Sequence, residues 1–61
     1  MNIQIVKKPN GDFVYKSFYR GSWYGDVVKT DPNKPTLTKA IVKAIAEKRL
    51  TRDFSIIDKH L

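Results

Sequence analysis

Hydrophobic and polar residues alternate along the first half of the chain in three runs that turn signals separate. The runs cover residues 3–8, 13–20 and 23–29 and are rich in aromatic and β-branched residues, which favour strands. Asn10-Gly11 predicts a two-residue type I′ turn after the first run, and Gly21-Ser22 predicts a type II′ turn after the second. The pattern therefore predicts a three-stranded antiparallel meander.

The second half changes to a helical period after residues 31–35, where two prolines and an asparagine cannot continue a strand ladder. Thr36 is a candidate N-cap. Apolar residues then recur at helical spacing: Leu37, Ala40, Ile41, Ala44 and Ile45. We expect the short, β-leaning residues 54–57 to form a fourth strand parallel to the first, with a second short helix as the alternative. The expected fold is α+β in a single domain over residues 1–61, with the element order β-β-β-α-β.

Two-residue turns would fix the register of the sheet and therefore its two faces. One face, called the tyrosine face, carries Val6, Phe13, Tyr15, Tyr19, Tyr24 and Val28. The other face carries Ile3, Ile5, Val14, Phe18, Trp23 and Val27 with four cations, Lys7, Lys16, Arg20 and Lys29. A covering helix would leave the ammonium of Lys16 no easy path to water. We therefore expect the helix on the tyrosine face and the cationic face open.

The composition is that of a small basic domain. Twelve Lys and Arg against six Asp and Glu give a net charge of +6 on 61 residues, so an anionic partner is favoured. A chain of this length buries only about 60% of its unfolded surface, so the core is small. The chain has no cysteine, which excludes disulfides and thiolate metal sites. The uncharged stretches are too short for a membrane span, and we expect a soluble, cytoplasmic monomer or homodimer.

Catalytic chemistry is not indicated by the sequence. His60 is the single histidine, Glu47 is the single glutamate, and the glycines lie in turns and strands rather than before a helix. Asp58 and His60 are two possible metal ligands, which is too few for a metal site. We therefore expect no enzymatic activity, no bound metal and no cofactor.

A cationic face with exposed aromatic residues predicts nucleic acid as the partner. Lys and Arg neutralise phosphates, while Phe and Trp stack on unpaired bases. The candidate contact residues are Lys7, Lys16, Phe18, Arg20, Trp23 and Lys29. A protein partner is the alternative, and its apolar anchors would be Ile3, Ile5, Phe18 and Trp23. A surface that only keeps the chain in solution is also compatible with this composition.

The run from Val6 to Tyr15, followed by Tyr19-Arg20-Gly21 and by Thr38-Lys39-Ala40, resembles the arm-site-binding domain of phage-type tyrosine integrases. The resemblance covers roughly residues 3–48 and includes no catalytic recombinase domain. It implies a three-stranded sheet that lies in the major groove of DNA, with one helix packed behind it. It also implies that Lys7, Lys16, Arg20, Trp23 and Lys29 contact the DNA.

Residues 36–57 are similar to the small phage antitoxin that neutralises toxins of the RNase LS family, mainly through the helix over residues 38–45. This second resemblance implies a phage-encoded inhibitor that blocks a host toxin or defence protein by direct contact. The basic charge departs from that of a nucleic-acid mimic, which should be acidic. The leading expectation is therefore a non-enzymatic, phage-type accessory domain that binds nucleic acid, with DNA first, and the inhibitor or antitoxin is the alternative.

Overall fold

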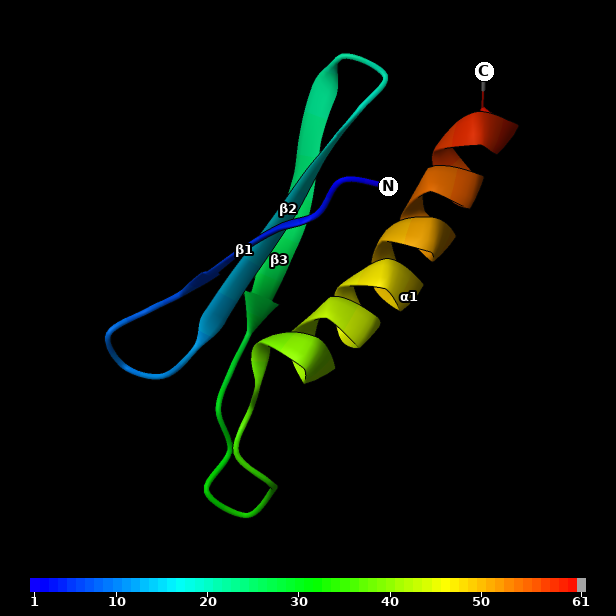
Figure 1. Cartoon of the computed structure of the whole chain (residues 1–61). Helices are drawn as coiled ribbons and strands as arrows, with labels where there is room; N and C mark the ends of the chain where they lie inside the picture. The colour runs from blue at the N-terminus through cyan, green and yellow to red at the C-terminus, as the bar shows by residue number, and fades with distance from the viewer. Residues whose placement is uncertain (61) are drawn as a thin grey trace.

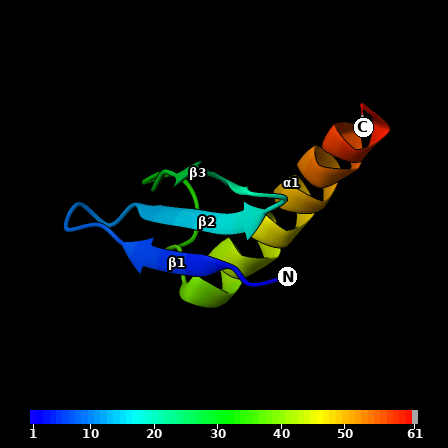
Figure 2. The same ribbon diagram turned by 90° about the horizontal axis from the view of Figure 1, so that it is seen from above.

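The computed structural model describes residues 1–60 and contains three strands followed by one helix (Figure 1). The elements are β1 (Gln4–Lys7), β2 (Phe13–Tyr19), β3 (Ser22–Val28) and α1 (Lys39–Lys59). The strands form one antiparallel sheet in the order β1-β2-β3. Figure 1 and Figure 2 show α1 running along one face of this sheet. The predicted α+β meander with one helix is confirmed.

The predicted fourth strand is wrong, because residues 54–57 belong to α1. The buried positions Val42, Ala46, Leu50 and Phe54 follow one another at four-residue steps, so Phe54 extends the stripe that faces the sheet. No glycine or proline interrupts residues 50–57 to end the helix. Packing of Phe54 thus overrides the β-propensity of the isoleucines that follow it.

The helix begins two residues later than predicted. Thr38, not Thr36, is the N-cap, and its Oγ1 accepts a hydrogen bond from the N–H of Ile41 at 3.2 Å. The prediction of Thr36 as the N-cap is therefore wrong.

The loop between β1 and β2 has three residues instead of the predicted two. The N–H of Gly11 donates to the carbonyl of Lys8 at 3.0 Å, and the N–H of Lys8 donates to the carbonyl of Asp12 at 2.7 Å. Pro9 supplies the fixed φ that suits a type I turn, and Gly11 takes a positive φ of 93° in the bulge that follows it. The extra residue shifts the pairing of β1 by one position, which turns each β1 side chain to the opposite face.

The loop between β2 and β3 has two residues, but it is centred one residue earlier than predicted. Arg20 and Gly21 both have positive φ, 48° and 86°, and Tyr19 pairs with Ser22. These angles define a type I′ turn rather than type II′. The pairing moves by two positions, so the β3 side chains keep their predicted faces.

The core lies between the tyrosine face and α1, as predicted. Its buried members are Phe13, Tyr15 and Val28 from the sheet and Val42, Ala46, Leu50 and Phe54 from the helix. Ile3 and Ile5 were predicted on the open face but pack against this core, because β1 is turned over. Val6 was predicted on the tyrosine face and is instead 60% exposed.

Candidate nucleic-acid interface

The face of the sheet that points away from α1 is built from alternate residues of the three strands. We call it the open sheet face; its members are Gln4, Val6, Val14, Lys16, Phe18, Trp23, Gly25 and Val27. Phe18 is 57% exposed and Trp23 is 54% exposed, while Val14 and Val27 are half-buried. Exposed aromatic and aliphatic side chains therefore dominate this face.

Phe18, Trp23 and Lys16 form one cluster on the open sheet face. Phe18 pairs directly with Trp23 across β2 and β3, with ring centroids 5.2 Å apart at an angle of 61°. The Nζ of Lys16 lies 4.8 Å from the centroid of the Trp23 ring, within cation–π range. Gly25 is the partner of Lys16 on β3 and contributes no side chain to this face. The cluster presents two aromatic rings and one positive charge to solvent.

Lys16 is the one cation that the strands of residues 1–60 place on this face. Arg20, predicted to join it, binds the end of α1 instead: its Nε donates to Oδ1 of Asp58 at 2.8 Å. The hydroxyl of Tyr19 donates to the same carboxylate at 2.8 and 3.0 Å. The Tyr19 side chain and then the charge of Asp58 raise the pKa of Arg20 above its ordinary value. Arg20 therefore fixes the β2–β3 turn to the helix.

The predicted position of Lys7 also changes. Lys7 pairs with Phe13 at the end of β1, so it points to the helix side of the sheet, where it lines a hollow of about 340 Å³ with Thr30 and Lys34. Lys29 is exposed directly after the last residue of β3. Lys7 and Arg20 thus leave the predicted grouping of four cations, and Lys16 is the cation that contacts Trp23.

Asp12 holds the loop end of the sheet in place. Its Oδ1 accepts hydrogen bonds from the N–H of Thr30 at 2.8 Å and from the Thr30 hydroxyl at 3.0 Å, and its Oδ2 accepts one from the Asn10 amide at 3.2 Å. The bond from the Thr30 backbone is the main reason that the pKa of Asp12 lies below its ordinary value, and the charge of Lys29 lowers it further. Asp12 therefore connects the β1–β2 loop to Thr30, two residues after the end of β3.

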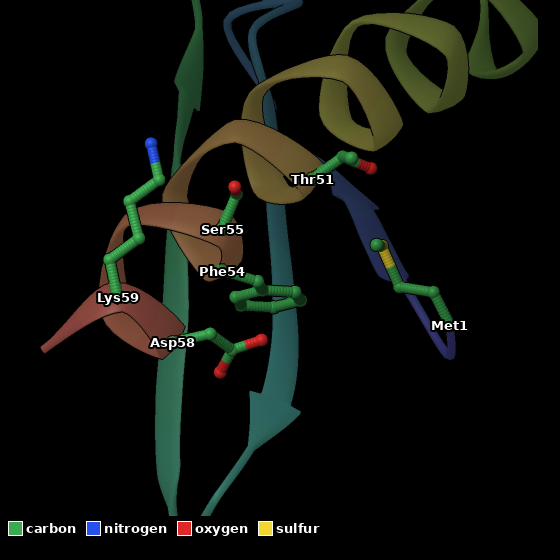
Figure 3. Close-up of a pocket in the computed structure, with 6 residues that line it drawn as sticks. All are labelled: Met1, Thr51, Phe54, Ser55, Asp58 and Lys59. Atoms are coloured by element: carbon green, nitrogen blue, oxygen red, sulfur yellow. The ribbon is translucent and has the colours of Figure 1, made fainter. Parts of the chain in front are cut away.

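A hollow of about 510 Å³ lies between Met1 and the last turns of α1 (Figure 3). Phe54 and Asp58 line it with Thr51, Ser55 and Lys59. The carboxylate of Asp58 already accepts hydrogen bonds from Tyr19 and Arg20. Asp58 thus joins the β2–β3 turn to the last turns of α1. Within residues 1–60, no three His, Asp or Glu side chains gather as a metal site would require.

The chain has no match to a protein-family model, to a curated protein or to a solved structure. In the part of the chain that the structure describes, no helix has the length and apolarity to cross a membrane.

The sequence prediction missed Val6 as a member of the open sheet face. Pro9 was the signal that could have placed it, because proline before Asn10-Gly11 favours a type I turn with a glycine bulge over a type I′ turn.

Proposed function

We propose that this protein binds single-stranded nucleic acid through the open sheet face. In this proposal, unpaired bases stack on Trp23 and Phe18, and a backbone phosphate contacts Lys16. The observation that carries it is the exposed aromatic pair with Lys16 4.8 Å from the Trp23 ring, in a chain of net charge +6. Stacking on aromatic side chains contributes about 1–3 kcal/mol per base.

Single strands suit this face better than a duplex does. A duplex presents closely spaced phosphates and stacked bases, so a protein that binds it needs several cations on the contact surface. Within the described strands the open sheet face has one, Lys16, beside aromatic rings that need unstacked bases as partners. The major-groove docking that the integrase resemblance implies would leave Phe18 and Trp23 without such partners. The other cations raise the local concentration of a polyanion at longer range.

The proposal keeps the biological role expected from the sequence. The protein would act without catalysis, as a phage-type accessory domain in the cytoplasm, with DNA as the ligand to test first.

Binding of a fluorescently labelled thymidine oligonucleotide, measured by anisotropy over a range of salt concentrations, tests this proposal. The plot of log K against log salt has a negative slope, and Lys16→Gln should make it shallower by about 0.7, the value for one phosphate contact on a single strand. Lys43→Gln removes an equal charge from α1 and should leave the slope unchanged. Trp23→Ala should weaken binding by about 1–3 kcal/mol. Equal slopes for the two lysine variants, with no loss in Trp23→Ala, would refute the proposal.

A protein partner is the second candidate function, and the exposure of Val6, Phe18 and Trp23 favours it. An inhibitor or antitoxin would bury these side chains in its target, although Ile3 and Ile5 would contribute little because they pack against the core. Such binding should depend weakly on salt, unlike binding to nucleic acid. Loss of a salt-insensitive complex in Trp23→Ala, without any effect on oligonucleotide binding, would favour this candidate.

A further inference from the structure

A second surface lies on α1, away from the open sheet face. Ile45, Lys48, Arg49 and Arg52 follow one another at the i, i+3, i+4 and i+7 positions and together line a hollow of about 520 Å³. We call these four residues the basic helix stripe. Because α1 covers the opposite side of the sheet, the stripe and the open sheet face belong to different surfaces of the molecule (Figure 2).

The stripe concentrates positive charge with little compensation. Lys48 and Arg52 are four residues apart and Arg49 and Arg52 are three apart, so like charges are neighbours on the helix, an arrangement that disfavours the helix. Within residues 1–60, the carboxylate found within ion-pair distance of the stripe is that of Asp53, 3.6 Å from Nε of Arg52. Most of this charge is therefore available to an anionic partner.

The stripe also has an apolar component. Ile45 is half-buried, and the aliphatic stems of the three cations cover the floor around it. The same line of the helix continues to Ile41, four residues before Ile45, and to Ile56, four residues after Arg52. Ile41 is 41% exposed and Ile56 is 50% exposed. Cations thus occupy the middle of a helix surface that has an exposed isoleucine at each end.

We propose that the basic helix stripe docks an acidic amphipathic segment of a partner protein. Carboxylates of that segment would meet Lys48, Arg49 and Arg52, and its apolar residues would cover Ile41, Ile45 and Ile56. A phosphate backbone would satisfy the charges but has no apolar groups to cover the isoleucines, so a protein segment is the better complement. With the open sheet face on the other side, one copy of this chain could hold nucleic acid and the partner protein together.

The test uses a synthetic 18-residue peptide with leucines on one helical face and glutamates beside them, together with a scrambled peptide of equal composition. Binding to the full chain is followed by anisotropy of the labelled peptide. Lys48→Gln/Arg52→Gln changes two exposed stripe residues, and Ile56→Gln changes the apolar end. The matched control Lys43→Gln/Lys59→Gln removes the same charge elsewhere on α1. Circular dichroism confirms that each variant is folded.

We expect the amphipathic peptide to bind more tightly than the scrambled one. Its affinity should fall roughly fivefold in Lys48→Gln/Arg52→Gln and fall also in Ile56→Gln, but change less than about twofold in the control. Equal losses in the two double variants would show general charge attraction and overturn the proposal. Equal affinity for the scrambled peptide would overturn it as well. If the stripe variant weakens oligonucleotide binding and leaves peptide binding unchanged, the stripe contacts nucleic acid instead.

Discussion

Replacement of Phe54 tests how the second half of α1 is held on the sheet. The side chain is 7% exposed, its ring stacks on that of Tyr19 with centroids 3.9 Å apart, and it meets the Tyr24 ring edge-on at 5.7 Å. Phe54→Ala would remove both aromatic contacts and leave a cavity between α1 and the β2–β3 hairpin.

The expected loss is large for a domain of this size. A buried Phe→Ala substitution costs about 3–5 kcal/mol, against a total of roughly 3–9 kcal/mol for a 61-residue protein. Phe54→Ala should therefore lose roughly a third or more of the free energy of unfolding. Phe54→Leu keeps most of the volume and loses the aromatic pairing, about 1–3 kcal/mol. Each kcal/mol corresponds to a decrease of about 4–8 °C in Tm.

Thermal unfolding followed by circular dichroism at the helix band provides the measurement. Ile56→Ala is the matched control, because Ile56 lies two residues away on α1 and is 50% exposed. Its unfolding free energy should change by less than about 0.5 kcal/mol. The argument fails if Phe54→Ala and Ile56→Ala have similar melting temperatures.

Three further predictions concern the sheet. Ile5→Ala should lower the unfolding free energy, measured by urea denaturation, by about 1–3 kcal/mol, while Val6→Ala should change it by less than about 0.5 kcal/mol. A larger loss in Val6→Ala than in Ile5→Ala would contradict the register of β1. Gly25→Ala should destabilise the protein by more than about 2 kcal/mol, because a methyl group there would overlap the backbone carbonyl of Tyr15; a wild-type melting temperature would contradict this close approach. The pKa of Asp12 is lower in the folded protein than its ordinary value, so its contribution to stability is complete above the ordinary pKa and is lost as the pH falls through the folded one. The difference in Tm between wild type and Asp12→Asn should therefore be constant near neutral pH and shrink on acidification below about pH 4, and a difference that grows there would contradict this role.

The sequence was sufficient to predict three strands, one helix and the buried tyrosine face. Strand runs and turn residues are local signals, and the alternation of side chains on β2 decides which residues share a face. The helix was predicted too short because the β-propensity of Ile56 and Ile57 was given more weight than the spacing of the apolar residues before them. Val42, Ala46, Leu50 and Phe54 recur every four residues, which was the local signal that the helix continues.

The candidate site was predicted less well than the fold. One additional loop residue, fixed by Pro9 and Gly11, reversed β1 and moved Lys7 away from the open sheet face. Arg20 was diverted by Asp58, which lies 38 positions along the chain and reaches the turn only because α1 continues to its full length. Phe18, Trp23 and Lys16 share a face as predicted because they depend on β2 and β3 alone.

Trp23 itself offers the most direct test of the proposed interface. It is the single tryptophan of the chain, it is 54% exposed, and it lies at the centre of the proposed contact, so its fluorescence reports on that surface alone. Titration with an unlabelled thymidine oligonucleotide should quench the Trp23 emission and protect the ring from quenching by acrylamide. Added salt should reverse both effects, because it weakens binding to the phosphate backbone. Binding by anisotropy with unchanged emission and unchanged acrylamide access would place the nucleic acid elsewhere and contradict the assignment of the open sheet face.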